Sequence, residues 1–557
     1  MRLYLVFGVI FLLGGVILFK LFEKQVIEFS QYARAARNQS ESETKIQAQR
    51  GRILTRDING ELFPLAVSEW TYELLVTPRQ IKNKRSFAEI LSPYLPEMSV
   101  EEIYSKVNND EVYIPPLVKN LSSERADEIR AQNLIGVTLQ PKLVRTYPER
   151  ENLAAQIVGF VDAAGIGKYG IEAVYDRELR GLPGERVAKR DSLGRLIDIL
   201  TTKEPQSGSD IILTVDHNVQ FVAETELKKA IETYQADGGS VVIINPKTGA
   251  VIAMAGYPTY DPNNFSKLAP EEHFKFLSTA ASNVYEPGSV VKPLTMAVAL
   301  DVGAVTPETT ETFGGSVQVL DRTIKNAEDK TFGRQNMTQV LENSDNVAMV
   351  WVSQQIGAEK LYQFFANFGF GKKLGLDVVG EQAGLLRPLK EWNDVLRSTA
   401  GFGQGISTTT VQLAAAYSAL ANGGNLVTPY LAEKAVVADK ATAFKHPDPV
   451  RVIKQETADA VKLMLESVVL NGHGKRAAVE GIRVGGKTGT AQVANPQGGY
   501  YENQHVGTFA GMFPIEDPQF VMVVRLDNPK TVRFAESSAA PTFGAIARWI
   551  TNYYQLR

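Results

Sequence analysis

The chain has no cysteine, which excludes any disulfide bond. Its 59 basic and 62 acidic residues nearly balance, so nothing in the charge points to nucleic acid. The glycine-rich segments lack the trailing Lys-Ser/Thr of a phosphate loop, and no nucleotide cofactor is expected. The histidines are few and lie without the spacing of metal ligands, so we expect no metal and interpret them as surface or hydrogen-bonded residues. They are His217, His273, His446, His473 and His505.

Long apolar runs are also scarce, because only one could cross a membrane. It extends from Leu3 to Phe19 and ends at Lys20, which is within the ~17–25 residues that span a bilayer as a helix. We predict an uncleaved transmembrane anchor at residues 1–22, with a cleaved signal peptide as the alternative. The flanking charges, Arg2 on one side and Lys20 and Lys24 on the other, do not decide the orientation.

Three short motifs in a fixed order carry the chemistry. They are S-x-x-K at Ser289 to Lys292, S-D-N at Ser344 to Asn346, and K-T-G-T at Lys487 to Thr490. Together they are the known signature of serine enzymes that form an acyl-enzyme, the class A β-lactamases and the penicillin-binding proteins.

Each motif alone is a weak signal, since the chain contains two decoys. Ser42 to Lys45 also reads S-x-x-K, in a polar stretch that we interpret as a solvated helix face or linker. Lys247 to Gly249 also reads K-T-G, but it joins two apolar, β-rich runs and is typical of a hairpin turn. Ser289 differs from both, because it precedes an apolar run that reads as a buried helix.

The motif residues suit acyl transfer. A serine hydroxyl needs a base to take its proton, and the i, i+3 spacing places Ser289 and Lys292 on one helical face. A lysine can act as this base only when its amine is neutral. Burial, the positive end of the helix and a second cation at Lys487 would each lower the pKa of Lys292.

The other motif residues have plausible roles in the same reaction. Ser344 could relay a proton to the leaving amine, and Asn346 could orient Lys292 and a substrate amide. Lys487 with the hydroxyls of Thr488 and Thr490 could hold a substrate carboxylate. Gly489 would let a substrate backbone lie close to the strand. The backbone N–H groups of Ser289 and Thr490 would form the oxyanion hole.

Flanking residues extend the motif set into a family resemblance over nearly the whole chain. Tyr285 to Pro293 looks like the pattern YEPGS-x-x-KP, and Gly401 to Ile406 like GYGQG-I with Phe402 in place of Tyr. On these residues the chain resembles a class B penicillin-binding protein, the monofunctional D,D-transpeptidases that cross-link peptidoglycan. Further matches precede the catalytic region: Arg50 to Ile53 with Asp57, Asn59 and Gly60, where Ile58 replaces Arg; Arg145 to Pro148; and Gly170 to Glu172 with Tyr175, Leu179, Gly181 and Gly184.

Length and pattern predict an α+β protein of three parts. We expect an anchor at residues 1–22, an elongated α+β pedestal at 23–205, and a transpeptidase domain at 206–557 whose antiparallel sheet is flanked by helices. The turn-forming residues at 207–209 mark the boundary before a strand-like run at 210–215. The resemblance implies that the Lys487 strand is an edge of the active-site cleft.

The resemblance implies a reaction and its partners. Ser289 would attack the penultimate D-Ala carbonyl of a stem peptide ending in D-Ala-D-Ala, release terminal D-Ala and pass the acyl group to an amine. Penicillin and other β-lactams would trap the acyl-enzyme. The catalytic part would lie outside the cytoplasm on a single-pass inner (plasma) membrane anchor, with a SEDS-type glycan polymerase and divisome membrane proteins as partners.

Several alternatives stay open at this stage. A β-lactamase or D,D-carboxypeptidase would need a positioned deacylating water, and the chain shows no Glu-x-x-Leu-Asn motif of the class A type. A membrane penicillin sensor or a degenerate structural member would be non-enzymatic. Within class B, the segments Gly159 to Asp162 and Gly170 to Glu172 look more like division-type members, as does the absence of appended C-terminal domains. An elongation-type member is the alternative.

Overall fold

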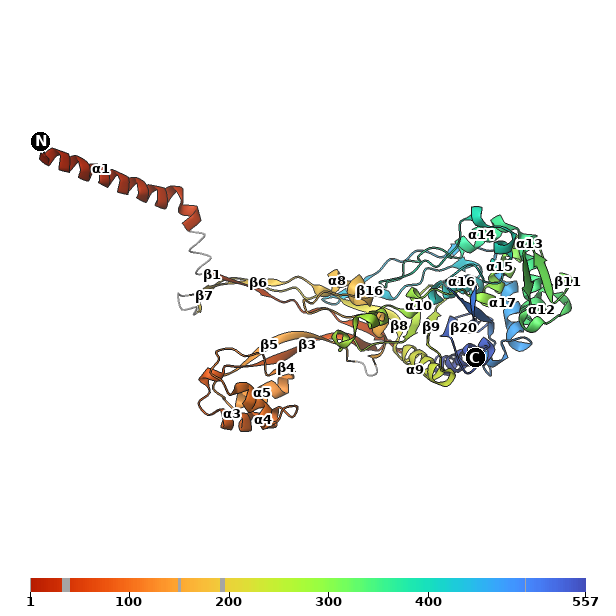
Figure 1. Ribbon diagram of the computed structural model, residues 1–557, viewed down its shortest axis with the longest axis horizontal. Coiled ribbons are helices and arrows are strands. Elements are labelled where there is room, and N and C mark those ends of the chain that lie inside the picture. The colour runs from red at the N-terminus through yellow and green to blue at the C-terminus, as the bar shows by residue number, and fades with distance from the viewer. Residues whose placement is uncertain (1, 33–40, 149–151, 191–195, 496, 557) are drawn as a thin grey trace. The chain divides into compact units, whose positions relative to one another are not determined.

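A computed structural model divides the chain into two compact units, and both contain helices and strands. Figure 1 shows these elements with their labels. One unit comprises residues 1–50 and 180–208, and the other comprises residues 51–179 and 209–557. The predicted α+β class is therefore confirmed. The structure describes residues 2–32, 41–148, 152–190, 196–495 and 497–556.

The first unit begins with the predicted apolar helix. Helix α1 spans Arg2–Phe22 and continues into a π-helical turn at Glu23–Ile27. By length and composition it is the one helix in the described part of the chain that could cross a membrane. None of its side chains is buried against the rest of the described chain.

The first unit also holds a three-stranded antiparallel sheet. Strand β6 (Gly184–Arg190) lies between β1 (Glu41–Ile46) and β7 (Leu196–Lys203). The decoy Ser42 to Lys45 belongs to β1, so the prediction of a helix face or linker is wrong there. The prediction relied on the polar composition of this segment. The segment forms a strand because it pairs with β6, and a local sequence pattern does not show such a distant partner.

The second unit contains a seven-stranded sheet in which strands from the two predicted domains pair. Strand β8 (Asp210–Asp216) runs parallel to β2 (Ile53–Arg56) and antiparallel to β16 (Ala432–Val437). The remaining pairings are antiparallel. These strands are β17 (Lys440–Ala443), β3 (Leu62–Val76), β4 (Val118–Leu121) and β5 (Val137–Thr146).

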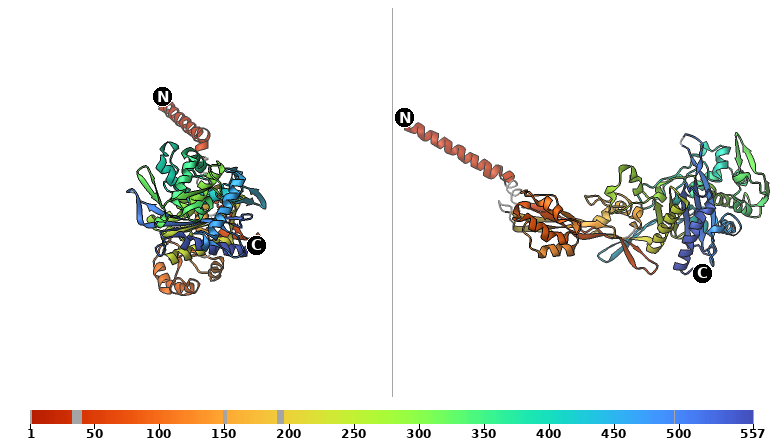
Figure 2. Two further views of the ribbon diagram at one scale, coloured as in Figure 1. Left: turned by 90° about the vertical axis from the view of Figure 1, so that its right-hand side faces the viewer. Right: turned by 60° about the horizontal axis from the view of Figure 1, so that its bottom comes forward.

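Three short helices cover the far ends of β3 and β5 and form a small lobe, coloured orange in the views of Figure 2. Leu74 and Val76 of β3 contribute to its own apolar core. Each helix begins at a side chain that accepts a hydrogen bond from a backbone N–H of the first turn, which satisfies a donor the helix leaves free. The helices and caps are α3 (Lys84–Leu91) at Asn83, α4 (Val100–Val107) at Ser99 and α5 (Ser123–Ala131) at Ser122.

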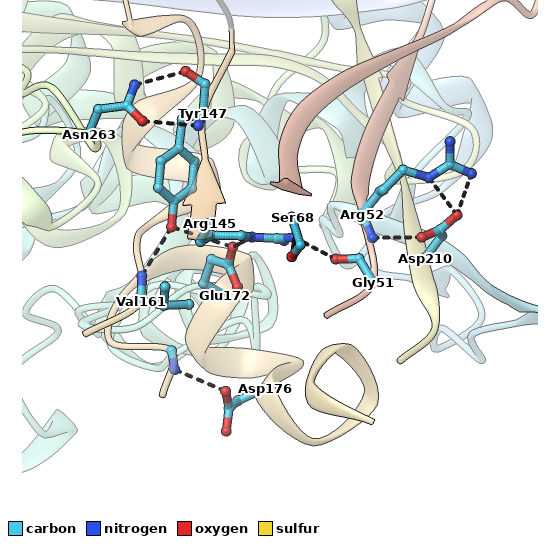
Figure 3. A network of polar contacts seen from close by, with 11 residues as sticks. Gly51, Arg52, Ser68, Arg145, Tyr147, Val161, Glu172, Asp176, Asp210 and Asn263 are labelled. Carbon is cyan, nitrogen blue, oxygen red and sulfur yellow. Dashed lines mark hydrogen bonds and ion pairs between the residues drawn. The ribbon is translucent and has the colours of Figure 1, made fainter. Parts of the chain in front are cut away.

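A buried ion pair joins strand β5 to helix α7 (Gly170–Val174), at the end of β5 away from this lobe (Figure 3). Arg145 Nε lies 2.6 Å from Glu172 Oε1, and the two side chains are 4% and 0% exposed. Arg145 also donates to the carbonyl oxygen of Gly51 at 2.8 Å and to Ser68 Oγ at 3.3 Å. Removing one member would leave a buried charge unpaired, so the loss of either side chain would destabilise the contact between the segments around residues 51, 145 and 172.

Two further contacts of the network link these segments to residues of the predicted catalytic domain (Figure 3). The Asn263 side chain accepts from the backbone N–H of Tyr147 at 3.0 Å and donates to its carbonyl at 2.8 Å. Arg52 binds the Asp210 carboxylate through its backbone N–H at 2.6 Å and its Nε at 2.9 Å. Both contacts lie within the second unit.

A five-stranded antiparallel sheet forms the centre of the catalytic part, as predicted. Its order is β10-β9-β21-β20-β19, so β19 is an edge strand. Strands β9 and β10 form a hairpin whose turn contains the decoy Lys247 to Gly249, which confirms the predicted turn. The strands are β9 (Gly238–Ile244), β10 (Val251–Tyr257), β19 (Gly485–Ala494), β20 (Tyr500–Phe513) and β21 (Phe520–Asp527).

Both faces of this sheet are buried, each against its own helices. Val241 and Ile243 of β9 face one core, with α9 (His217–Tyr234) and α18 (Ala539–Tyr553). Val242 and Ile244 face the larger core. Side chains alternate along a strand, so a run of consecutive apolar residues covers both faces. The larger core includes α11 (Lys292–Asp301), α16 (Thr410–Ala421) and α17 (Gln455–Leu470).

Candidate active site

The predicted nucleophile Ser289 lies in a 3₁₀ turn, Gly288–Val291, which leads directly into α11. Gly288 has φ of +60°, and its N–H donates to the carbonyl of Gly403 at 3.0 Å. Gly403 has φ of +89°, and a Cβ there would lie 2.1 Å from Gly288 O. Glycine is therefore required at 403, where the Gly-rich loop supports the nucleophile turn.

Lys292 is completely buried and connects two of the motifs. Its Nζ donates to the carbonyl oxygen of Ser344 at 2.6 Å, to Ser344 Oγ at 3.2 Å and to Asn346 Oδ1 at 2.7 Å. Burial, and then the nearby charge of Lys487, hold the pKa of Lys292 well below its ordinary value, while Asp345 acts in the opposite sense. A lysine held neutral in this way is suited to act as a base.

Ser344 occupies a strained turn between α12 (Met337–Glu342) and α13 (Asn346–Ile356). Its φ of +52° is in the left-handed region, which is uncommon for a residue with a side chain. The next residue, Asp345, anchors the turn by accepting a hydrogen bond from Ala348 N at 2.9 Å. The turn thereby presents both the carbonyl and the hydroxyl of Ser344 to Lys292.

Asn346 is oriented from two sides. Its Nδ2 donates to the carbonyl of Lys325, the last residue of β13 (Arg322–Lys325), at 3.0 Å. Its backbone N–H donates to Asn326 Oδ1 at 2.7 Å. Because the Nδ2 group is committed to Lys325, the Oδ1 atom is turned toward Lys292.

The K-T-G-T motif lies on the edge strand β19, and alternation along the strand divides its residues. Lys487 is completely buried, while Thr488 and Thr490 line the cleft. Lys487 Nζ donates to the carbonyl of Thr488 at 3.0 Å. Burial lowers the pKa of Lys487 to about 7, although the Glu536 carboxylate opposes this shift.

Gly489 has a packing role that we did not predict from the sequence. A Cβ at this position would lie 2.9 Å from Pro287 O and 2.9 Å from Val290 Cγ1. The missing side chain therefore lets the turn that carries Ser289 pack directly on β19. Gly489 is absent from the described residues that line the cleft, and the expected approach of a substrate backbone stays a prediction.

A cleft of about 890 Å³ brings the motifs together. Ser289, Ser344 and Asn346 lie on its wall with Thr488 and Thr490, while the two lysines are buried behind it. Within the described part of the chain, the Ser289 hydroxyl makes no hydrogen bond to another side chain. It is therefore free to meet a substrate that enters the cleft.

Sequence reasoning missed a contact between Glu286 and two residues that line this cleft, Gly405 and Tyr500. Glu286 Oε2 accepts a hydrogen bond from the Tyr500 hydroxyl at 2.9 Å, and Oε1 accepts from Gly405 N at 2.9 Å. Burial raises the pKa of Glu286. Glu286 stands in the motif that precedes Ser289, but no local pattern indicates that Tyr500 lies against it.

Sequence reasoning also missed a histidine in the cleft. His473 Nδ1 lies 2.7 Å from Glu536 Oε2, and both side chains line the cleft. Their wide separation along the chain hid the pair. Within the residues that the structure covers, no group of three His, Cys, Asp or Glu side chains could hold a metal ion.

Comparison with known proteins agrees with this geometry. Residues 239–548 match the penicillin binding protein transpeptidase domain, and residues 45–213 match the penicillin-binding protein dimerisation domain. The chain belongs to the class B penicillin-binding proteins. Its catalytic part is a penicillin-binding serine D,D-transpeptidase domain.

Two curated relatives cover most of this penicillin-binding protein. Stage V sporulation protein D of Bacillus subtilis (strain 168) is 35% identical over 551 residues, which cover 96% of this chain and 84% of the relative. Peptidoglycan D,D-transpeptidase FtsI of Escherichia coli (strain K12) is 30% identical over 495 residues, which cover 87% and 80%.

Solved structures share the fold of this penicillin-binding protein. Penicillin binding protein 3 of Mycobacterium tuberculosis, complexed with aztreonam, has a TM-score of 0.72 at 27% identity and covers 92% of this chain and 98% of its own. Penicillin Binding Protein 2X of Streptococcus thermophilus has a TM-score of 0.78 at 22% identity, covering 92% and 80%. The second likeness concerns the fold alone.

Proposed function

We propose that this protein cross-links peptidoglycan through an acyl-enzyme on Ser289. The donor is a stem peptide that ends in D-Ala-D-Ala. The Ser289 oxygen forms a bond to the penultimate D-Ala carbonyl carbon, the C–N bond to terminal D-Ala breaks, and an amine of a second stem peptide then takes the acyl group.

The three hydrogen bonds of Lys292 are the observation that carries this proposal. They connect the turn of Ser289 with the backbone and side chain of Ser344 and with Asn346. Neutral Lys292 has two N–H bonds, which donate to the Ser344 carbonyl at 2.6 Å and to Asn346 Oδ1 at 2.7 Å, and its lone pair accepts the proton of Ser289 during attack. Ser344, 3.2 Å from the lysine, is placed to relay that proton to the leaving amine, which would otherwise depart as an unstable anion.

The remaining motif residues bind substrate in this mechanism. Thr488 and Thr490 offer hydroxyls on the cleft wall to the donor carboxylate, with Lys487 behind them. The N–H groups of Ser289 and Thr490 stabilise the oxyanion. Donors of this kind typically contribute about 3 kcal/mol each to transition-state stabilisation.

The test is a time course of intact mass after benzylpenicillin is added to the full chain in detergent. A stable one-to-one adduct on Ser289 supports the proposal, and Ser289→Ala should remove the adduct while the thermal unfolding profile stays the same. An adduct that disappears as drug is consumed would indicate a β-lactamase. No adduct at high drug concentration would point to a degenerate member or a penicillin-resistant site.

We further propose a role in septal wall synthesis. The chain is similar over most of its length to proteins named Peptidoglycan D,D-transpeptidase FtsI and Stage V sporulation protein D. Depletion in the native cell should give undivided filaments, with the protein at the division site. Rounded cells, with the protein along the lateral wall, would instead support the elongation-type alternative.

The same proposal places the protein in its surroundings. Residues 1–22 form a single-pass anchor in the plasma membrane, 23–205 the pedestal, and 206–557 the transpeptidase domain outside the cytoplasm. A SEDS-type glycan polymerase and divisome membrane proteins are its partners. Co-purification of such a polymerase with the full chain, and its loss when residues 1–22 are exchanged for another transmembrane helix, would test this arrangement.

A further inference from the structure

One wall of the cleft carries a charged cluster that the proposed mechanism does not use. We define the charged cluster as Glu328, Lys330, His473, Arg533 and Glu536, all of which line the cleft. Two ion pairs occupy four of its members. His473 Nδ1 lies 2.7 Å from Glu536 Oε2, and Lys330 Nζ lies 2.7 Å from Glu328 Oε2.

Arg533 differs from the other cations of the cleft wall. Its guanidinium lies over the Phe534 ring, 5.5 Å from the centroid. Its charge helps to lower the pKa of Glu328, but among the described residues no carboxylate oxygen lies within ion-pair distance of it. Arginine is always charged, and its planar fork matches a carboxylate in two hydrogen bonds. The remaining lysines and arginines have acidic partners: Arg322–Asp321 at 3.8 Å, Lys325–Asp329 at 3.1 Å and Lys330–Glu328 at 2.7 Å.

The position of Arg533 indicates which molecule could use it. The backbone N–H of Ala535 donates to Thr490 Oγ1 at 3.0 Å, so residues 533–536 begin where the K-T-G-T strand presents its hydroxyls. In the proposed function these hydroxyls hold the terminal carboxylate of the donor. The donor ends at that group, and a charge beyond it faces something other than the donor.

The chemistry of transfer identifies that other molecule. In the second half-reaction the acceptor nitrogen forms an amide bond to the acyl carbon, the ester bond to Ser289 Oγ breaks, and the proton of the amine returns to that oxygen. This step reverses acylation with a new amine in place of D-Ala, so the acceptor enters where D-Ala leaves. The rest of the acceptor then extends past Thr490 toward the charged cluster.

We propose that Arg533 binds a carboxylate of the acyl acceptor, one separated from the attacking amine by several bonds. This inference rests on the proposed function and adds to it the chemical class of the acceptor. It makes the favoured acceptor a peptide that carries both a free amine and a free carboxylate, with Arg533 determining specificity in the second half-reaction only.

The experiment uses the full chain in detergent, a D-alanyl thioester donor and two acceptors, Nα-acetyl-L-lysyl-D-alanine and its C-terminal amide. Both offer the same amine and differ in the carboxylate alone. The readout is the ratio of aminolysis to hydrolysis. We expect the wild type to favour the free acid, and Arg533→Ala to lose about ten-fold in transfer to the acid and little with the amide.

Matched variants separate this role from a general effect of charge. Arg322→Ala removes another cleft arginine and should leave the preference unchanged, whereas Arg533→Lys should retain part of it. A wild type with no preference for the acid, or an Arg533→Ala protein that keeps the preference, would overturn the inference.

Acylation by benzylpenicillin distinguishes a failure of this inference from a failure of the proposed function. Arg533→Ala should be acylated at the wild-type rate, because the drug occupies the donor site. Slower acylation of the variant would assign Arg533 to the donor and overturn the inference alone. Absence of any wild-type adduct would overturn the proposed function, and this inference with it.

Discussion

The same three residues, Lys-Thr-Gly, stand at two places in this chain and do different things. At 247–249 they form the turn of the β9–β10 hairpin, where Lys247 is 48% exposed and its Nζ lies 2.6 Å from Asp517. At 487–489 they lie on edge strand β19, where Lys487 is 0% exposed.

This comparison shows that burial, more than residue identity, decides what a lysine can do. In the turn, water and a carboxylate stabilise the ammonium of Lys247. On β19, burial disfavours the charge and lowers the pKa of Lys487 to about 7. A group that changes charge near neutral pH can bind an anion and still exchange a proton.

The largest contrast is expected from removing each lysine in turn. Lys487→Met should slow acylation by benzylpenicillin about 10²–10³-fold, since it deletes electrostatic stabilisation at the reacting centre. Lys247→Met should leave the rate unchanged. The measurement is the second-order acylation rate from intact mass. Thermal unfolding checks that both variants are folded. If two folded variants were acylated at equal rates, Lys487 would have no more part in the reaction than Lys247.

Changing Gly489 or Gly249 to alanine should affect different properties, the acylation rate for Gly489 and the stability for Gly249. Gly489→Ala pushes a Cβ to 2.9 Å from Pro287 O, which displaces the nucleophile turn, and a shift of about 1 Å can cost 10²-fold in rate. Gly249→Ala forces φ of +86° and a 2.3 Å contact with Thr428 O. Strain of this kind costs about 1–3 kcal/mol in the free energy of unfolding.

Acylation rate per folded molecule, together with the unfolding midpoint, separates these effects. Gly489→Ala should lose rate, whereas Gly249→Ala should lose stability and keep its rate. The reverse pattern would contradict the packing described for β19.

The pKa of Lys487 predicts a pH dependence. Because this pKa is lowered to about 7, the positive charge is present below pH 7 and is lost as the pH rises through that value. Preference for benzylpenicillin over its methyl ester should therefore fall by up to about ten-fold between pH 6 and 8, as the charged fraction falls. Titration of Lys292 affects both compounds equally and cancels in this ratio of acylation rates.

A matched variant checks whether Lys487 is the group responsible for this pH dependence. Lys487→Arg carries a permanent charge and should show a preference independent of pH. If the preference of this variant still declined over the same range, another group would be responsible.

The smallest effect is expected from the hydrogen bond between Tyr500, in the β19–β20 hairpin, and Glu286. Tyr500→Phe removes one hydrogen bond to Glu286, whose other oxygen still accepts from Gly405 N. The loss should be about 1 kcal/mol in the free energy of unfolding, with little change in acylation. Thermal unfolding measures it, and a severe loss of acylation would show that Tyr500 acts in the chemistry.

Much of the fold and site follows from local pattern. The unbroken apolar run at 241–244 predicts a strand buried on both faces, and β9 has that environment. Asn245, Pro246 and Gly249 predict a turn between two strands, and the β9–β10 hairpin confirms it. The helix after Ser289 could also be predicted from the sequence, because its apolar pattern depends only on residues close together in the chain.

Other features depend on partners that no local pattern names. The polar segment at 41–46 becomes a strand because β6 pairs with it. Tyr500 reaches Glu286 across more than two hundred residues, and Gly489 is small because the nucleophile turn packs on it. Each outcome requires knowledge of which distant segments meet.

By itself, the sequence determined the reaction type, because the order and chemistry of Ser289, Lys292, Ser344 and Lys487 leave few alternatives to serine acyl transfer. Only the tertiary structure decided the electrostatic state of that site. Whether a lysine is charged depends on the water removed around it and on the dipoles that replace that water, and these come from the segments folded over it. Lys247 and Lys487 therefore share a motif but differ in chemistry.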